Sequence, residues 1–356
     1  MYRNIEVKNF RGIRHLEINT LKQINLFLGK NNCGKSSLLE ALFLLSGASN
    51  PLLTINVNLF REYTKVEWSD ILLLFYQLNE HQPIEIIAVS DSKTHSLQIE
   101  PFSETVLQPP VLQNGIDNAN NRLNTIYGLK NTLRISNGQD ESLEFKLNIQ
   151  PESNSSTHYK FKINSDNEYT SGLKSKFLSP KFQFQVSVEK LKELKIEGNL
   201  QPIIEILRQV DERIVSLDYI DRDVYVDLGF GKLVPINVMG DGIRKLLGII
   251  VSMYECKEGM LFIDEIDNGF HYSLMPLLWQ TVLESAKKLN VQVFASTHSI
   301  DSLRGLADIT SNNKVDTMRD KTACYYLQTM ETGEIKSYQY NADKFEFLIN
   351  QGEEIR

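Results

Sequence analysis

Residues 24–45 read INLFLGKNNCGKSSLLEALFLL, and this stretch decides the fold. Residues 24–28 are apolar on both faces of a strand, which is typical of a strand buried in a parallel sheet. They lead into residues 29–36, which satisfy the pattern G-x-x-x-x-G-K-S/T, and then into residues 37–45, which have helical propensity. The order strand, glycine loop, helix predicts an α/β protein with a phosphate-binding loop.

The residue types in this loop suit a nucleotide. Gly29 and Gly34 let backbone N–H groups converge on phosphates without a Cβ in the way, and the helix N-terminus adds partial positive charge. Lys35 is expected to reach the β- and γ-phosphates, and Ser36 to bind Mg²⁺. The remaining predicted nucleotide-binding residues of the loop are Asn31, Asn32, Cys33 and Ser37. The alternative is a chance Gly-Lys-Ser turn.

A second strand ends in two acids. Residues 260–263 are apolar and are followed by Asp264 and Glu265. We predict that Asp264 lies beside Mg²⁺ and that Glu265 polarises an attacking water. Because adjacent strand residues point to opposite faces, the two carboxylates are expected to play different roles. The alternative is a solvated acidic turn.

A third apolar strand, residues 291–295, ends in Ser296-Thr297-His298-Ser299. Ligands of parallel sheets lie at the C-terminal strand ends, so these polar groups should meet the phosphate loop and the two acids. His298 is predicted to donate a hydrogen bond to the γ-phosphate and to be catalytic together with Lys35 and Glu265. A purely structural histidine is the alternative.

Composition bounds the remaining possibilities. The chain has 356 residues, with 38 Lys+Arg against 45 Asp+Glu and a net charge of −7, so only a local basic patch could bind DNA or RNA. The three cysteines, Cys33, Cys256 and Cys324, lack the spacing of a disulfide framework or a zinc site. Cys33 is interpreted as a tolerated small residue, or as a redox switch whose thiol pKa the helix N-terminus lowers. The N-terminus has no apolar signal region and no run is long enough to span a membrane, so we expect a cytoplasmic protein without a membrane partner.

The chain is expected to contain one ATPase-like domain split in sequence, formed by residues 1–48 and 200–356. Between them, residues 49–199 are predicted to be an insertion with antiparallel strands near 84–89, 143–149, 159–163 and 182–188. Polar segments at 113–124, 151–158 and 164–172 are expected to be exposed loops. Helices are predicted at 242–254 and 273–289, and a hairpin at 323–340.

The motifs NFRGI, GKNNCGKSS, MGDGIRK, LFIDEIDNGFH and STHS occur in this order. With them the chain resembles the AAA15 or OLD-like branch of ABC-type ATPases, relatives of the heads of Rad50, SMC and RecF. The resemblance covers residues 1–48 and about 200 to the end. It implies an ABC-type head with a mixed or parallel core sheet, an N-terminal antiparallel β part and a central α+β insertion, and it implies ATP and Mg²⁺ as ligands.

The resemblance also implies a homodimer in which two subunits pack head to tail around ATP. Gly240, Asp241 and Gly242 would then face the γ-phosphate bound by the other subunit. The alternative is a turn that starts a helix with Asp241 as its N-cap. Arg11 would lie near the phosphates, and Asp267 and His271 would lie at the dimer interface.

Two functions of an active ATPase are open, and a third possibility is a nucleotide-locked scaffold with negligible turnover. In the first, the chain resembles ATPase subunits of two-component phage-defence systems, and is an ATP-driven switch that controls a separate effector such as a nuclease or Toprim-like protein. Because no Toprim-like segment follows the ATPase motifs, intrinsic nuclease activity is not expected. In the second, it is a DNA-repair ATPase that contacts DNA directly, with the six lysines of residues 174–195 as the candidate surface.

Overall fold

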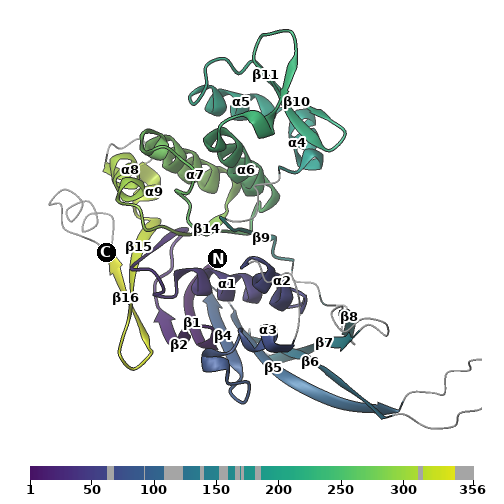
Figure 1. Ribbon diagram of the computed structural model, residues 1–356. Coiled ribbons are helices and arrows are strands. Elements are labelled where there is room, and N and C mark those ends of the chain that lie inside the picture. Colours follow the sequence, from purple (N-terminus) through teal and green to yellow (C-terminus); the bar gives the residue numbers. More distant parts are fainter. Residues whose placement is uncertain are drawn as a thin grey trace, which may run out of the picture.

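The computed structural model describes residues 1–61, 68–91, 93–107, 123–136, 140–151, 159–164, 169, 172–180, 186–311 and 316–340. Within them, thirteen strands form one continuous sheet with the order β8-β7-β6-β5-β4-β1-β2-β16-β15-β3-β14-β13-β9. Helices cover both faces of its central part (Figure 1). The fold class is therefore α/β with a mixed parallel and antiparallel sheet, as the sequence predicts.

The parallel part carries the motif-bearing strands. It consists of β3 (Ile24–Leu28), β14 (Gln292–Ser296), β13 (Met260–Ile263), β9 (Ser175–Leu178) and β15 (Thr322–Thr329). Ala295 is the partner of both Leu26 and Ile263 in the register. Because β3, β13 and β14 run parallel and in step, the loops after them open at one edge of the sheet.

The mainly antiparallel part continues the same sheet from β15 to β16 (Ile335–Tyr340), which pairs in parallel with β2 (Ile13–Ile18), and on to β1 (Tyr2–Phe10). It goes on through β4 (Ile84–Ser90), β5 (Thr94–Leu107), β6 (Leu123–Ser136), β7 (Asp140–Pro151) and β8 (Tyr159–Asn164). The strands β4–β8, which lie within residues 49–199, are thus joined to the N-terminal strands by hydrogen bonds rather than standing apart. The division of the chain at residues 48 and 200 stays a prediction.

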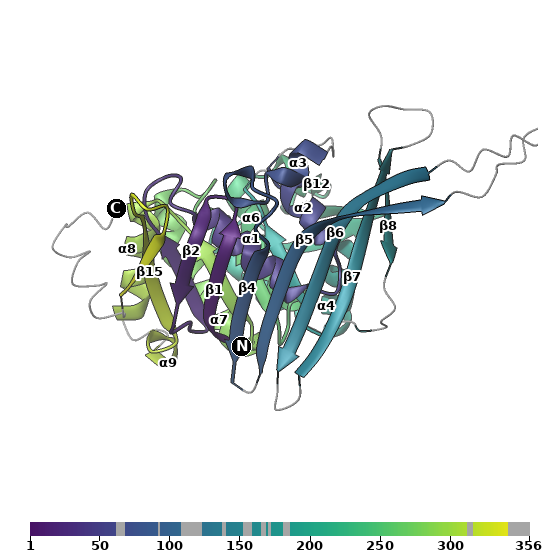
Figure 2. The same ribbon diagram turned by 90° about the horizontal axis from the view of Figure 1, so that it is seen from below.

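The helix α1 (Lys35–Ser46), which follows the phosphate loop, lies between the two parts of the sheet. Its residues Ser37 to Ser46 are all buried, because Phe27, Phe262 and Phe294 of the parallel strands pack on one side and the inner face of β1 and β4–β7 on the other. The short helices α2 (Leu53–Leu59), α3 (Trp68–Leu72) and η1 (Tyr76–Leu78) follow it. In Figure 2 the antiparallel strands lie in front and the helices lie behind them.

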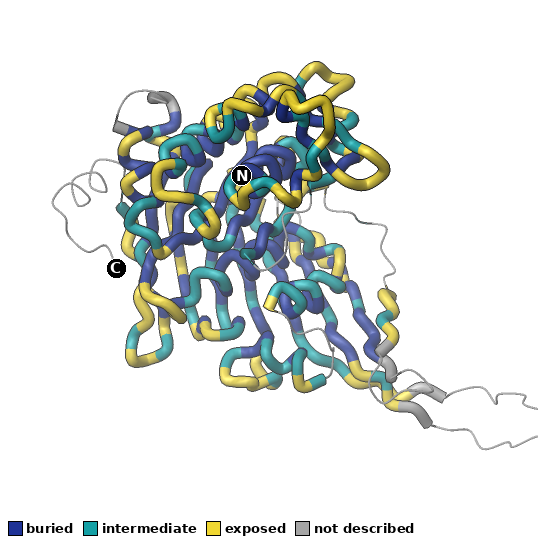
Figure 3. The backbone as a smooth tube through the Cα atoms, turned by 45° about the horizontal axis from the view of Figure 1, so that its top comes forward, coloured by how far each residue is buried: buried dark blue, intermediate teal, exposed yellow. Residues whose placement is uncertain are grey.

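The opposite face of the parallel strands is covered by a second layer of helices. It contains α6 (Asp241–Glu255), η3 (Tyr272–Leu274), α7 (Met275–Leu289), α8 (Ile300–Ser311) and α9 (Asp316–Arg319). A smaller lobe packs on α6 and contains α4 (Val188–Ile196), α5 (Leu200–Arg208), β10 (Ser216–Ile220), β11 (Asp223–Asp227), β12 (Leu233–Pro235) and η2 (Ile236–Val238). Figure 3 shows the buried residues concentrated in the sheet and in the helices packed on it.

One predicted element differs from the structure. The strand predicted at 182–188 is wrong where it can be seen, because Val188 begins α4, and residues 181–185 lie outside the described part of the chain. Ser187 caps this helix, since its side chain accepts a hydrogen bond of 3.1 Å from the Lys190 N–H. The predicted loops at 113–124, 151–158 and 164–172 lie mostly outside the described residues, but residues 123–124, 151 and 164 belong to β6, β7 and β8, so the loop prediction is wrong there.

A buried glutamine joins the N-terminus to the parallel strands. The Gln292 side chain, fully buried, accepts a hydrogen bond from the Tyr2 N–H and donates to the carbonyl oxygens of Tyr2 and Lys22, each at 2.8 Å. Gln292→Leu leaves these backbone groups unpaired, so we expect it to lower the free energy of unfolding by about 3 kcal/mol. Urea denaturation checks this, with the exposed Gln201→Leu as the control that should leave the midpoint unchanged.

In the described part of the chain, none of the helices combines the length and the apolar character needed to cross a bilayer.

Candidate nucleotide site

A cavity of about 720 Å³ opens where the loops after β3, β13 and β14 meet. It brings together residues from all three predicted motifs, although the phosphate loop is more than 200 positions from the other two in the sequence. Its lining residues are Arg11, Gly12, Asn31, Asn32, Gly34, Lys35, Ser36, Ser37, Arg61, Asp264, Glu265, Ser296 and His298. Of the residues predicted to bind nucleotide, Gly29, Cys33, Gly240, Asp241 and Gly242 are not among them.

The phosphate loop has the backbone that an anion requires. Gly29, Asn32 and Gly34 have positive φ values of 136°, 63° and 93°, and such conformations let a loop form a concave surface of N–H groups for an anion. Gly34 is the N-cap of α1 and supplies no side-chain hydrogen bond, which leaves the first N–H groups of the helix available for a ligand. Lys35 Nζ donates to the carbonyl oxygens of Gly29 at 2.7 Å and Lys30 at 3.0 Å. The ammonium group is thereby held across the loop, although Gly29 itself is not part of the cavity wall.

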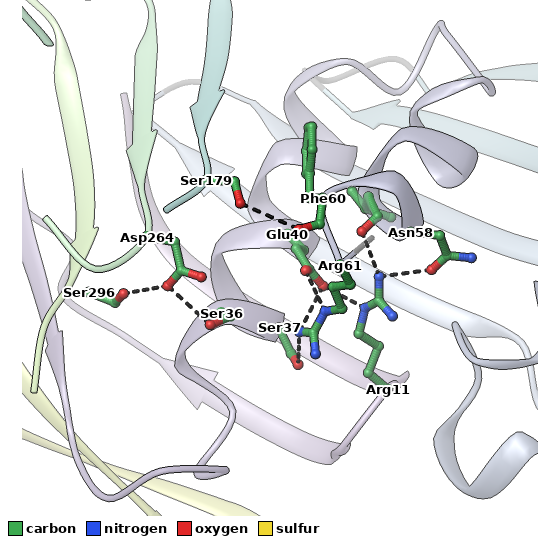
Figure 4. Close-up of polar contacts among 11 residues, drawn as sticks. Arg11, Ser36, Ser37, Glu40, Asn58, Phe60, Arg61, Ser179, Asp264 and Ser296 are labelled. Carbon is green, nitrogen blue, oxygen red and sulfur yellow. Dashed lines mark hydrogen bonds and ion pairs between the residues drawn. The ribbon is translucent and has the colours of Figure 1, made fainter. Parts of the chain in front are cut away.

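Two oxygen groups form a candidate Mg²⁺ site beside the loop, and a third bonds to one of them. Ser36 Oγ donates to Asp264 Oδ1 at 3.0 Å, and Ser296 Oγ donates to the same oxygen at 2.5 Å (Figure 4). Hydroxyl and carboxylate oxygens are the ligands that Mg²⁺ prefers, and Mg²⁺ is held by few protein groups when phosphate oxygens complete its shell. The pair Ser36 and Asp264 therefore fits this ion, and Ser296 orients the carboxylate.

Glu265 sits in an unusual backbone conformation. Its φ of 50° is left-handed, and its N–H donates to Ser296 Oγ at 2.9 Å. A non-glycine residue rarely adopts this φ, and such strain is concentrated at functional sites. The strand β13 ends at Ile263, so the expectation that the two acids face opposite sides of a strand is wrong. Both carboxylates line the same cavity, but only Asp264 is bonded to Ser36.

His298 lines the cavity from the loop that follows β14. Thr297, beside it, is buried, and its hydroxyl donates a short hydrogen bond to Asp267. This bond fixes the loop after Glu265 against the loop that carries His298. His271, in contrast, is exposed, and its Nδ1 lies 2.9 Å from Ser273 Oγ.

Two arginines of the cavity wall share a buried glutamate, Glu40, that lies behind them. Arg11 lines the cavity, and its guanidinium also contacts the surrounding protein: Nε lies 2.5 Å from Glu40 Oε2, and Nη2 donates at 3.0 Å to both Val57 O and Asn58 Oδ1. Arg61 bonds the same carboxylate, from Nε to Oε1 at 2.8 Å (Figure 4). The Arg61 side chain is 38% exposed, against 7% for Arg11.

Arg61 is the wall residue that the sequence analysis missed. No motif surrounds it, and it reaches the cavity only because Glu40, one turn beyond Ser36 and Ser37 on α1, holds its guanidinium there. A polar residue on the buried side of an otherwise apolar helix was the available signal.

The segment around Gly240 does not belong to this cavity in a single chain. Gly240 is the N-cap of α6, with no side-chain hydrogen bond, and Asp241 is the first helical residue. Asp241 accepts from Arg244 Nη2 at 2.7 Å. The alternative interpretation of Asp241 as the N-cap is wrong, because Gly240 takes that position, and Gly240, Asp241 and Gly242 do not line the cavity of their own chain.

All three cysteines are buried. Burial raises the pKa of Cys33 above its ordinary value, with Lys35 opposing the shift, and it raises the pKa of Cys256 to about 12. Desolvation also raises the pKa of Cys324. The lowered Cys33 pKa expected from a helix N-terminus is therefore wrong, because loss of solvent outweighs the favourable charge.

The chain is similar to known proteins in sequence and in fold. Residues 24–304 match the protein family described as "AAA domain, putative AbiEii toxin, Type IV TA system". An "ATP/GTP phosphatase" of Helicobacter pylori is 27% identical over 321 residues, which is 84% of this chain and 85% of that protein. The "DNA replication and repair protein RecF" of Nitrosococcus oceani is 40% identical over 42 residues, 12% of each chain.

Among solved structures, the SmcHead bound to the C-winged helix domain of ScpA superimposes with a TM-score of 0.50 at 10% sequence identity, covering 97% of this chain and 99% of that one. This likeness concerns the fold alone. Because the family match extends over most of the chain, from β3 to α8, the chain belongs to the AAA_21 family of ATPases.

Proposed function

We propose that this chain binds ATP with Mg²⁺ and hydrolyses it to ADP and phosphate, and that it belongs to the OLD-like branch of these ATPases. The observation that carries the proposal is the meeting of Lys35, Ser36, Asp264, Glu265 and His298 around one cavity. Lys35 and the N-terminus of α1 bind the phosphates, and His298 donates to the γ-phosphate. Glu265 takes the proton of the attacking water. Ser36 and Asp264 hold Mg²⁺, which neutralises charge on the β- and γ-phosphates when bound.

Phosphate release by the purified chain tests this proposal. We expect turnover of ATP in the presence of Mg²⁺, complete loss of turnover with excess EDTA, and recovery when Mg²⁺ is restored. No phosphate release at saturating ATP and Mg²⁺ would overturn it.

We further propose that ATP joins two chains head to tail. The uncapped N-terminus of α6 lies outside its own cavity, and an unsatisfied helix N-terminus favours an anion such as a γ-phosphate held by a second copy. Phosphate contacts made only in the closed dimer let ATP shift the population toward it. Light scattering after size exclusion, with and without ATP, measures the mass; a monomer under both conditions contradicts the dimer.

The dimer is proposed to act as a switch on a separate effector, in the manner of a two-component phage-defence system. Support comes from the family description, which names a toxin of a type IV TA system, and from the SMC head solved with ScpA bound. Co-expression with the product of the adjacent reading frame, followed by co-elution with ATP or ADP, tests this: elution that does not depend on the nucleotide counts against a switch.

The alternative function, direct action on DNA, receives less support from the lysines of residues 174–195. Lys176 pairs with Glu255 at 2.5 Å, and Lys190 pairs with Glu193 at 2.7 Å. Lys195 lies 3.4 Å from Asp218, while Lys181 lies outside the described residues. Paired lysines offer phosphates less net charge. Salt-dependent DNA binding that is lost when Lys174, Lys176 and Lys181 are neutralised together would favour the alternative.

A further inference from the structure

Lys245 is a buried lysine that the site described above does not use. It lies on α6, one helical turn after Asp241, and only 8% of the residue is exposed. Burying an ammonium group is costly unless it is hydrogen-bonded, so a lysine at such a position has specific acceptors.

Its acceptors lie on the loop that carries Glu265. Lys245 Nζ donates to the Asn268 carbonyl oxygen at 2.7 Å and lies 3.5 Å from Asn268 Oδ1. The same asparagine donates from Nδ2 to Glu265 Oε2 at 3.5 Å. A continuous line of polar contacts therefore runs from α6 to the carboxylate of Glu265.

The loop is shaped to receive this side chain. Gly269 has a φ of 80°, and a Cβ on it would lie 2.6 Å from Lys245 Nζ and 3.1 Å from its Cε. Any other residue here would meet both a left-handed backbone and the lysine.

The rest of the loop is fixed from β14. The Ile266 N–H donates to the Ser296 carbonyl oxygen at 3.0 Å, and Asp267 accepts from Thr297. The loop is therefore held between β14, which belongs to its own nucleotide site, and α6, whose N-terminus lies outside that site.

We propose that Lys245 is a positioning residue for Glu265, which ties the orientation of the Glu265 carboxylate to the position of α6. This rests on the proposed role of Glu265 as the base. A shift of α6 that lengthens the 2.7 Å bond moves the Asn268 carbonyl and, through the Asn268 side chain, the carboxylate that must meet the water. Closure of α6 on a second copy would in this way prepare the base in its own chain.

The charges around Lys245 are consistent with this position. Burial lowers the pKa of Lys245, while Asp241 on α6 and Glu265 and Asp267 on the loop raise it, and Arg244 lowers it further. The acids therefore favour the charged form that burial disfavours.

Lys245→Met and Gly269→Ala test the proposal from the two sides of the contact. We expect each variant to lower kcat at least tenfold while the Kd for ATP stays within twofold of the wild type, because the phosphate-binding groups are untouched. Lys257→Met, an exposed lysine just beyond α6, is the control that should keep the wild-type kcat.

Two results would overturn the proposal. Wild-type kcat in either folded variant would show that the contact does not position Glu265. A parallel loss of ATP affinity and kcat would show a general structural role instead. Absence of hydrolysis by the wild-type chain is a separate result, since it contradicts the proposed function before Lys245 is considered.

Discussion

Glu265→Gln is expected to lower kcat for ATP hydrolysis by about a thousandfold while leaving ATP bound. Glutamine keeps the shape of the side chain and the Ser296 hydrogen bond to the residue 265 N–H, but it cannot take a proton from water. Lys35, Ser36 and Asp264 remain in place, so nucleotide affinity should change little. The variant should therefore accumulate as the proposed ATP-bound dimer.

Single-turnover phosphate release and light scattering measure these two effects on the same sample. The matched control is Glu284→Gln, an exposed glutamate on α7. A wild-type kcat in Glu265→Gln would show that Glu265 is not the base. A slow variant that stays monomeric at saturating ATP would agree with Glu265 as the base but would argue strongly against the head-to-tail dimer.

Glu40→Gln is expected to destabilise the chain, because it removes one charge of a buried ion pair. The carboxylate is buried, with its side chain 3% exposed, and contacts Arg11 at 2.5 Å and Arg61 at 2.8 Å. Removing one partner of a buried ion pair costs about 3 to 5 kcal/mol, because an uncompensated charge stays behind. Arg11 is that charge, whereas Arg61 is partly exposed and water screens its share. We therefore expect the free energy of unfolding to fall by about 3 kcal/mol. We also expect the Arg61 guanidinium to be held less firmly at the cavity.

Guanidinium unfolding measures the loss in Glu40→Gln, and ATP titration measures the consequence for the site. Glu144→Gln is the control, because Glu144 is 57% exposed and 4.0 Å from Lys130, so its midpoint should not move. Equal midpoints for the two variants would show that Glu40 is not needed to balance Arg11.

The parallel half of the fold could be predicted because its signals are local. A strand buried on both faces, such as Ile24–Leu28, shows as a continuous apolar run, and the polar residues after β3, β13 and β14 mark one edge of the sheet. These same signals predict that Lys35, Ser36, Asp264 and His298 lie together at that edge, and all four line the cavity.

The ends of the long antiparallel strands could not be predicted from local sequence signals. Pro101 and Gly128 interrupt the sequences of β5 and β6, and both residue types usually weaken a strand. The structure shows why Gly128 is acceptable: Phe102 of the neighbouring strand packs over it, and a Cβ there would lie 2.7 Å from the ring. Such compensation comes from another strand and leaves no local trace.

The same reason explains what was missed in the site. Arg61 reaches the cavity through Glu40, and the φ of Glu265 depends on the bonds that Ser296 makes. Each is set by contacts between distant segments. A motif identifies the groups that meet the ligand, whereas the side chains that hold those groups are visible only after folding.

The buried cysteines have a practical consequence for these experiments. Since Cys33, Cys256 and Cys324 are enclosed and their thiols hold their protons more tightly than usual, maleimide reagents at neutral pH should react slowly with the native chain. A single cysteine introduced on the surface could then carry a spin label or fluorophore without a thiol-free background. Distances between two labelled copies would report nucleotide-dependent pairing in solution with the rest of the sequence intact.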